Sequence, residues 1–245
     1  MRRIKLIVSY DGTNYVGWQK QINGIAVEEI INKALSKLLN EDIEVIGASR
    51  TDSGVHALGN VAVFDTESRI PGDKFCFALN QYLPEDIRIQ ESCEVDSDFH
   101  PRFCDTIKTY EYSILNRRFD IPTSRLYHYF MYMPLDVEKM QAGAVYIKGE
   151  HDFKSFCSAR SQVKDTVREV TDIQVFKEGE YIKIRVSGTG FLYNMVRIIA
   201  GTLIKVGLGV YPPEYVKEIL DAKDRNAAGP KAPARGLTLI EIKYL

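Results

Sequence analysis

The sequence predicts an α+β protein made of two fused halves of similar construction. Three observations lead to this fold class: a length of 245 residues, a globular composition with 45% hydrophobic residues, and the order β-α-β-β-α-β, which occurs twice along the chain. Each half is then a split βαβ, or ferredoxin-like, unit with an antiparallel sheet. We expect the helices to pack on one face of each sheet and the opposite faces to line a shared cleft.

The first half, residues 1–104, begins with a strand that is followed by an amphipathic helix. Residues 3–10 alternate apolar and polar side chains, which is the period of a strand. From Val27 to Leu39 the apolar residues recur at three- and four-residue spacing, which is the period of a helix. The remaining elements expected in this half are strands at 43–48 and 60–65, a helix at 72–82 and a strand at 86–92.

The second half, residues 105–245, repeats this order without a repeat of individual residues. Its expected elements are a strand at 107–115, a helix at 135–149, strands at 168–176 and 181–187, helices at 191–207 and 213–223, and a last strand at 237–243. The apolar run from Phe191 to Ile204 contains Arg197 and is shorter than the roughly 20 residues that cross a membrane. We therefore expect it to form a core helix.

The charge of the chain is balanced overall but uneven along its length. With 32 basic and 33 acidic side chains the net charge is −1, which excludes a uniformly basic, tail-like nucleic-acid binder. Residues 154–168 carry four basic side chains against one acid, residues 181–205 carry four against none, and residues 84–98 are strongly acidic. The two basic segments predict a phosphate-binding face, with ordinary solvated surfaces as the alternative.

The sequence contains no pattern typical of secretion or of a metal or redox site. The start of the chain runs directly into the first strand without an apolar signal segment, so we expect a cytoplasmic protein. The 4 cysteines form no C-x-x-C pair and the 4 histidines are scattered, so we expect neither a metal nor another cofactor.

A polar, glycine-bounded loop is the first candidate for chemistry. Residues 47–59 read GASRTDSGVHALG and lie between two expected strands, a position that commonly carries function. The alternative is a tight turn in which Asp52 caps its own backbone.

Two further candidates lie in the second half. Arg197, on an apolar helix, must either reach water or meet an acid, and Asp52 is a good candidate partner. A carboxylate beside an arginine stays ionised at neutral pH, which suits a nucleophile. Tyr110 and Tyr112 point to the same face of their strand, either as core side chains or as a platform for a nucleobase.

Five segments together resemble the TruA family of tRNA pseudouridine synthases. They are YDGTNYVGWQ at 10–19, RTDSGVHA at 50–57, KTYEY at 108–112, NMVR at 194–197 and GLTL at 236–239. Their order and spacing fit the family along almost the whole chain, and the R-T-D-x-G-V-H-A stretch is highly specific. The resemblance implies a cofactor-free isomerase that detaches uracil from its ribose, rotates it and rejoins it through carbon 5.

The resemblance also implies a substrate and a set of roles. The family acts as a homodimer on the tRNA anticodon stem-loop, at roughly positions 38 to 40, and must flip the target base out of the stack. The implied roles are a nucleophile at Asp52, a base-stacking ring at Tyr110, a basic partner of Asp52 at Arg197, extrusion of the target nucleotide by Arg50, and packing near the uracil by Leu237. Ser53 and Asn60 stand where alanine and glutamine are common in the family.

Two basic residues are expected to hold tRNA phosphates away from the uracil. Lys164 and Arg168 lie in the basic segment 154–168, and phosphate contacts position an RNA without touching the reacting base. The alternative is that they pair with Asp165 or Glu169.

Two other functions remain open from the residues alone. A non-catalytic RNA-binding module would explain the basic segments and the strand aromatics, but not Asp52 and Arg197. A glycosidase would need two carboxylates where the 47–59 loop offers one. The residues are compatible with attack by Asp52 either at C6 of the base or at C1′ of the sugar.

Overall fold

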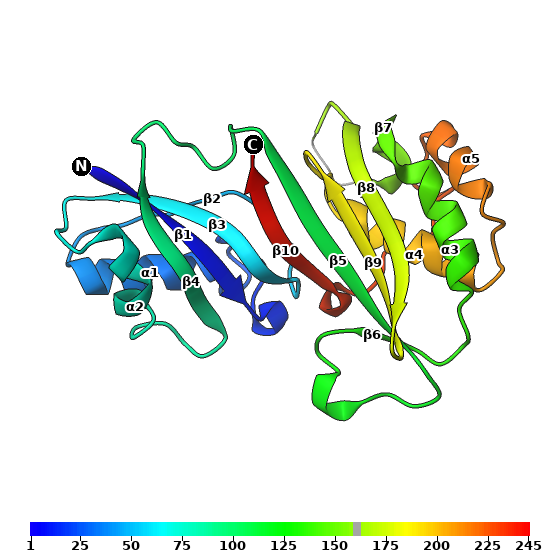
Figure 1. Ribbon diagram of the computed structural model, residues 1–245, viewed down its shortest axis with the longest axis horizontal. Helices are drawn as coiled ribbons and strands as arrows, with labels where there is room; N and C mark the ends of the chain where they lie inside the picture. Colours follow the sequence, from blue (N-terminus) through cyan, green and yellow to red (C-terminus); the bar gives the residue numbers. More distant parts are fainter. Residues whose placement is uncertain (159–162) are drawn as a thin grey trace. The chain divides into compact units, whose positions relative to one another are not determined.

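The computed structural model describes residues 1–158 and 163–245, which form two compact units (Figure 1). Unit 1 comprises Met1–Asp105 and Thr238–Leu245, and unit 2 comprises Thr106–Leu237. The last strand, expected with the second half, groups from Thr238 onward with unit 1, where it pairs with the strand His56–Thr66. Arg160 of the basic segment 154–168 lies outside the described residues.

The sheet of unit 1 is mostly antiparallel. Its strands are β1 (Arg2–Tyr10), β2 (Ile46–Gly47), β3 (His56–Thr66), β4 (Ile87–Val95) and β10 (Leu237–Tyr244). β1 lies between β4 and β3 and is antiparallel to both, and β2 is antiparallel to β3. β10 runs parallel to β3, with Thr238 opposite His56. The alternation expected for residues 3–10 is confirmed, since Ile4, Leu6 and Val8 are buried.

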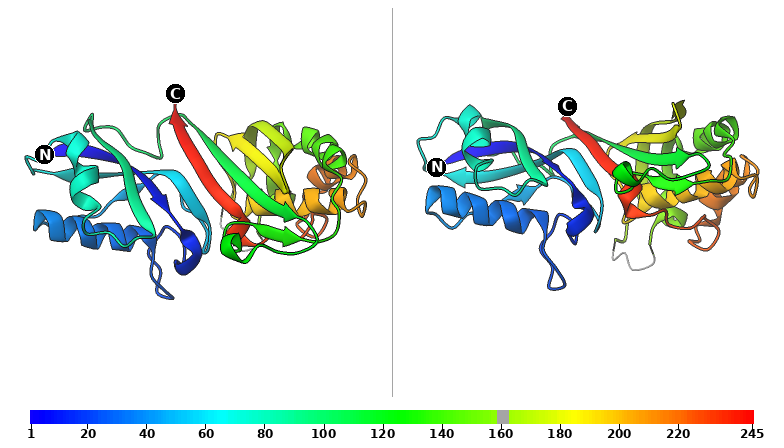
Figure 2. Two further views of the ribbon diagram at one scale, coloured as in Figure 1. Left: turned by 60° about the horizontal axis from the view of Figure 1, so that its bottom comes forward. Right: turned by 90° about the horizontal axis from the view of Figure 1, so that it is seen from below.

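Two helices pack in unit 1, α1 (Val27–Leu39) and α2 (Phe75–Leu79), with 3-10 turns η1 (Gly12–Asn14) and η2 (Gly72–Lys74). Figure 2 shows α1 lying along the sheet of this unit, where it buries Ile31 and Leu35. The helix expected at 72–82 is shorter because the Asn80 side chain bonds the backbone of Ile89 in both directions, at 2.9 and 2.8 Å.

The strand expected at 43–48 shrinks to two residues. The backbone N–H of Ile43 donates to the Ser36 hydroxyl at 3.0 Å, and that of Val45 donates to the Asn32 side chain at 2.9 Å. These backbone donors therefore bond to side chains of α1 instead of to a neighbouring strand.

Unit 2 contains an antiparallel sheet with the order β5-β9-β8-β7. Its strands are β5 (Thr106–Asn116), β6 (Tyr129–Met131), β7 (Gly149–Asp152), β8 (Val167–Glu178) and β9 (Tyr181–Gly188), with β6 parallel to β5. β6 and β7 were not predicted from the sequence, because they are too short to show a periodic pattern.

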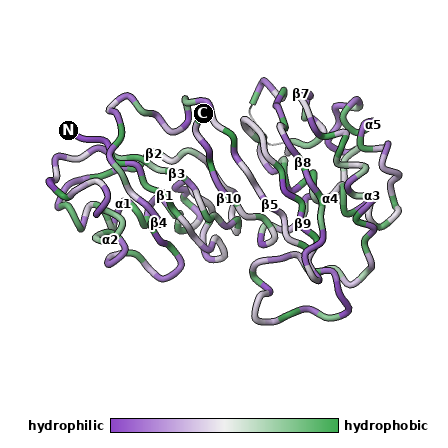
Figure 3. Tube along the Cα trace, viewed as in Figure 1, coloured by the Kyte–Doolittle hydropathy of each residue, from purple (hydrophilic) through white to green (hydrophobic). Residues whose placement is uncertain are grey.

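The helices of unit 2 are α3 (Val137–Ala144), α4 (Met195–Gly207) and α5 (Tyr215–Ala222), with 3-10 turns η3 (Pro122–Ser124), η4 (Val145–Ile147), η5 (Phe153–Phe156) and η6 (Ala234–Gly236). α4 is buried along nearly its whole length, as expected for a core helix, and its hydrophobic residues are green in Figure 3. It begins later than the predicted residue 191 because Asn194 has a left-handed backbone, with φ 62°.

The α+β class with mostly antiparallel pairing is thus confirmed. Within the described ranges, no helix has the length and apolar character needed to cross a membrane.

Candidate active site

Asp52 lies in unit 1, in the loop that connects β2 to β3. The loop is bonded to the segment after β1. Gly17 and Asp52 form an antiparallel bridge, and the Thr51 carbonyl accepts a hydrogen bond from the backbone N–H of Trp18 at 3.2 Å. The Val55 N–H donates to the Asp52 carbonyl at 3.1 Å. The backbone on both sides of this half-buried aspartate is therefore held in place.

Two glycines permit this close approach of chain segments. A Cβ on Gly17, whose φ is +111°, would lie 2.4 Å from the Thr51 carbonyl oxygen. A Cβ on Gly12 would lie 2.0 Å from the carbonyl oxygen of Val55. Both distances are far below van der Waals contact, so the 10–19 motif is the support on which the Asp52 loop rests.

A buried polar network underlies the loop. The Tyr10 hydroxyl lies 2.7 Å from the Thr51 hydroxyl, and the Asn60 amide donates to the Ser49 carbonyl at 3.1 Å. Asn60 is fully buried, and its other amide atom accepts from the Val61 N–H. From the sequence Asn60 received no role, although a lone amide in an otherwise apolar strand was an available signal.

His56 anchors the start of β3 to the same segment. The Gly12 N–H donates to Nδ1 of this buried histidine at 3.1 Å, and the Asp11 carboxylate lies 3.1 Å from the same atom. Arg50, by contrast, is exposed on the loop, two residues before Asp52.

Tyr110 belongs to unit 2, on β5 opposite Val186 of β9. Its ring is 7% exposed and meets Phe191 edge-on, with 5.3 Å between the ring centroids. Tyr112, on the same face, is fully buried and its hydroxyl donates to the Pro233 carbonyl at 2.9 Å. Burial raises the pKa of the Tyr112 phenol, and the nearby Arg197 charge opposes this rise.

Arg197 is held by its own unit and does not extend to solvent. Its side chain is 8% exposed, Nε donates to the Ala232 carbonyl at 2.8 Å, and Nη1 donates to the Asn194 side chain at 3.0 Å. The Ala232 N–H donates back to the Arg197 carbonyl at 3.1 Å. Of the two outcomes expected for Arg197, the structure does not show the one in which its side chain reaches water, and the Ala232 carbonyl and the Asn194 side chain orient the guanidinium.

Leu237 is buried at the start of β10 and follows a segment held at two points. Ala232 is bonded to Arg197, and Pro233 is bonded to Tyr112. Unit 2 thus brings Arg197, Tyr112 and the segment that ends at Leu237 together.

The two expected phosphate-binding residues lie near the start of β8. Lys164 is exposed, and Arg168 donates to the carbonyls of Asp165 and Val167 at 3.3 and 2.5 Å. In the described part of the chain neither forms an ion pair with Asp165 or Glu169, so their charges remain available to an anion.

The other basic segment, 181–205, is partly neutralised. Lys183 and Arg185 form ion pairs with Glu111 on the neighbouring strand, at 3.0 and 2.6 Å. Burial alone would raise the pKa of Glu111, but these two ion pairs outweigh burial and lower it. Among residues 1–158 and 163–245, no three side chains of the metal-binding types are grouped to hold an ion.

A carboxylate on a loop whose backbone is held on both sides is a group that an enzyme can use in covalent chemistry. The family profile described as tRNA pseudouridine synthase matches residues 6–104 and 144–245. The chain belongs to this family, as its TruA-like segments predicted.

Curated relatives agree with this assignment over their full lengths. The tRNA pseudouridine synthase A of Ruminiclostridium cellulolyticum is 51% identical over 245 residues, and that of Acetivibrio thermocellus is 50% identical over 246 residues. Each alignment covers 100% of this chain and 100% of the relative. The expected family and enzyme class, a tRNA-acting isomerase, are confirmed.

Proposed function

We propose that this enzyme converts uridine to pseudouridine in the tRNA anticodon stem-loop, at roughly positions 38 to 40, after flipping the base. The observation that carries the proposal is the rigid support of the Asp52 loop by Gly17 and Trp18 in a member of this family. A nucleophile must be held close to its productive position, and backbone bonds on both sides of Asp52 provide this.

In the proposed reaction Asp52 is the nucleophile and Arg197 its basic partner. An ionised carboxylate can form a covalent intermediate without a metal or a cofactor. The glycosidic bond from N1 to C1′ breaks, a bond from C5 to C1′ forms, C5 loses a proton and N1 gains one. The two contacts of the Arg197 guanidinium with Ala232 and Asn194 hold the positive charge in one orientation.

The remaining residues act on the flipped nucleotide. Extruding a base costs a few kcal/mol, which stacking and filling of the gap offset. Arg50, exposed on the loop, fills the gap, and Tyr110, whose ring direction is fixed by Phe191, stacks on the uracil. Leu237 packs near the base, while Lys164 and Arg168 hold phosphates.

The architecture belongs to the same proposal. We infer that residues 1–104, with the Asp52 loop, and 105–245, with Tyr110 and Arg197, are ferredoxin-like halves, each with helices packed on one face of its sheet and catalytic residues served by the other face. The strand order β4-β1-β3-β2 in unit 1, antiparallel throughout, supports a split βαβ arrangement there. The working enzyme is a cytoplasmic homodimer, which sedimentation of the purified protein tests; a monomer under turnover conditions would contradict it.

The decisive experiment compares wild type with Asp52→Ala on unmodified tRNA transcripts. We expect pseudouridine formation to vanish in the variant, because the nucleophile supplies the chemistry. Affinity for tRNA falls less than about tenfold, because phosphate contacts dominate binding. Mapping the modified positions tests the choice of target, and turnover near the wild-type rate in the variant would overturn the role of Asp52.

A further inference from the structure

An arginine that the sequence analysis did not single out lies beside the Asp52 loop. Arg102 follows β4 in unit 1, and its Nε–H donates to the Gly47 carbonyl at 2.6 Å. Gly47 is the last residue of β2 and directly precedes the loop segment that leads to Asp52. Arg102 is thereby placed near the support of the catalytic loop.

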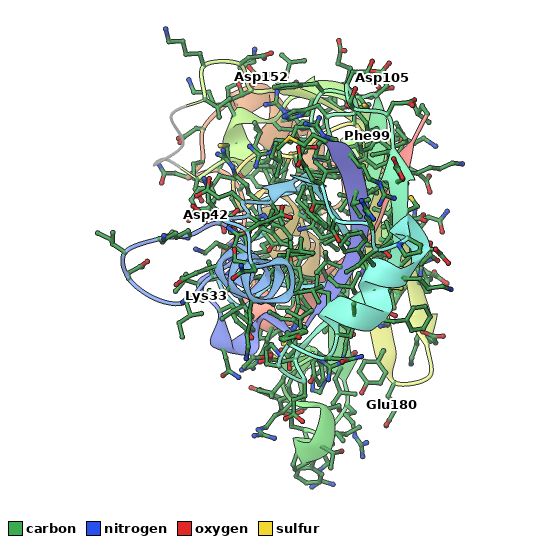
Figure 4. All side chains as sticks on the ribbon, turned by 90° about the vertical axis from the view of Figure 1, so that its left-hand side faces the viewer. Lys33, Asp42, Phe99, Asp105, Asp152 and Glu180 are labelled. Carbon is green, nitrogen blue, oxygen red and sulfur yellow. The ribbon has the colours of Figure 1, made fainter. Side chains whose placement is uncertain are left out.

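The backbone that carries Arg102 is anchored on its N-terminal side. The Pro101 carbonyl accepts from the Tyr244 hydroxyl at 3.1 Å. Phe99, labelled in Figure 4, packs against Tyr244 in a tilted arrangement with 5.0 Å between ring centroids, and its carbonyl accepts from the Arg3 side chain at 3.1 Å. With both its backbone and its Nε held, the Arg102 guanidinium has a set position while the side chain stays exposed.

Arg102 lies in the field of a second arginine, Arg50. Burial lowers the pKa of Arg102, and the positive charge of Arg50 lowers it further, whereas Glu28 has a smaller, opposite effect. The Glu28 carboxylate already accepts a hydrogen bond from the backbone N–H of Lys20 at 2.6 Å. In the described ranges neither Arg50 nor Arg102 forms an ion pair with an acid. The structure therefore keeps two like charges together, an arrangement that a bound anion would make favourable.

We propose that Arg50, besides filling the gap left by the flipped base, joins Arg102 in binding one phosphodiester group of the RNA backbone beside the target uridine. This rests on the proposed function, in which the RNA is a tRNA. Arg102 uses only Nε for Gly47, so its Nη groups remain for phosphate oxygens. Because Arg50 stands two residues before Asp52, the bound phosphate lies next to the nucleotide that Asp52 attacks. A flipped nucleotide must rotate about its backbone, and a held phosphate fixes the axis of that rotation.

The first test compares Arg102→Gln with Arg69→Gln, an exposed arginine in the same unit that serves as the matched control. With an unmodified tRNA transcript, we expect KM to rise about tenfold in Arg102→Gln and kcat to change far less, because a phosphate contact contributes mainly to binding. The slope of log Kd against log salt should fall by about 0.7 to 0.9, the value for one phosphate. Arg69→Gln should alter neither quantity, and Arg102→Lys, which retains the charge, should restore the slope.

The second test asks whether both arginines hold the same phosphate. In the Arg50→Gln, Arg102→Gln double variant, the slope of log Kd against log salt should fall by the value for one phosphate, as in each single variant. It should not fall by the value for two phosphates. A series of anticodon stem-loops is also made, each with one phosphate replaced by an uncharged methylphosphonate. At one position in this series, the loss of affinity caused by the methylphosphonate and the loss caused by Arg102→Gln should not add, because both remove the same contact.

Three results would overturn the proposal that Arg50 and Arg102 bind one phosphate together. One is a wild-type salt slope and KM in Arg102→Gln, and another is additivity at every methylphosphonate. The third is a lowered kcat and unfolding midpoint with an unchanged salt slope, since that pattern means Arg102 only supports Gly47. Failure of the wild-type enzyme to form pseudouridine would refute the proposed function instead, because the salt slope is measured on binding alone.

Discussion

Gly17→Ala tests whether the 10–19 segment supports the Asp52 loop. At Gly17 an added Cβ would lie 2.4 Å from the Thr51 carbonyl oxygen, whereas ordinary contact begins at 3.4 Å. Thr51 and Asp52 must therefore move by about 1 Å, a displacement that can cost a well-aligned reaction about 100-fold. The φ of +111° adds strain, because side chains rarely adopt that backbone conformation.

The matched control is Gly179→Ala, in the turn between β8 and β9. Gly179 also has a positive φ, +60°, but an added Cβ there meets nothing within 4 Å. It should lose only about 1 kcal/mol of unfolding free energy to backbone strain. Gly17→Ala adds the overlap, typically 1–3 kcal/mol, for a total loss of about 2–4 kcal/mol.

Two assays separate the effects. Urea unfolding is followed by the fluorescence of Trp18, the single tryptophan, which is fully buried and whose backbone N–H donates to the Thr51 carbonyl. Single-turnover pseudouridine formation gives the rate of the chemical step. We expect a fall of about 100-fold for Gly17→Ala and the wild-type rate for Gly179→Ala. Equal stabilities of the two variants together with a wild-type rate for Gly17→Ala would refute the reasoning.

Three more predictions concern charges. Arg197→Met should lower kcat more than it weakens binding, and adding Asp52→Asn should recover part of the lost stability, since the amide needs no charged partner; additive losses would show no coupling. Replacing Lys164 and Arg168 together by glutamine should flatten the salt dependence of tRNA binding by about one to two units, and an unchanged slope would remove them from the RNA surface. Ion pairs hold the pKa of Glu111 below its usual value, so the stabilisation from this carboxylate is present above the unfolded-state pKa and is lost as pH falls through the lower folded-state pKa. The deficit of Glu111→Gln in urea unfolding should therefore shrink below about pH 4.5, and a deficit independent of pH would contradict this.

Local sequence was enough to predict most elements of this fold. Period-two alternation predicted β1, and helical spacing predicted α1 with its start at Val27, because each pattern reflects one buried face of one element. The strand at 43–48 was overestimated since its backbone donors bond to side chains of α1, a competition between segments that no local pattern records.

The sequence by itself also determined the family and the candidate residues, because Asp52, Tyr110 and Arg197 stand in specific motifs. Only the tertiary structure decided what holds them. The bridge between Gly17 and Asp52, the bond from Asn60 to Ser49 and the bond from Arg102 to Gly47 all join residues of different elements or loops. Such contacts depend on the packing of whole elements, so they leave no periodic signal in the residues that make them.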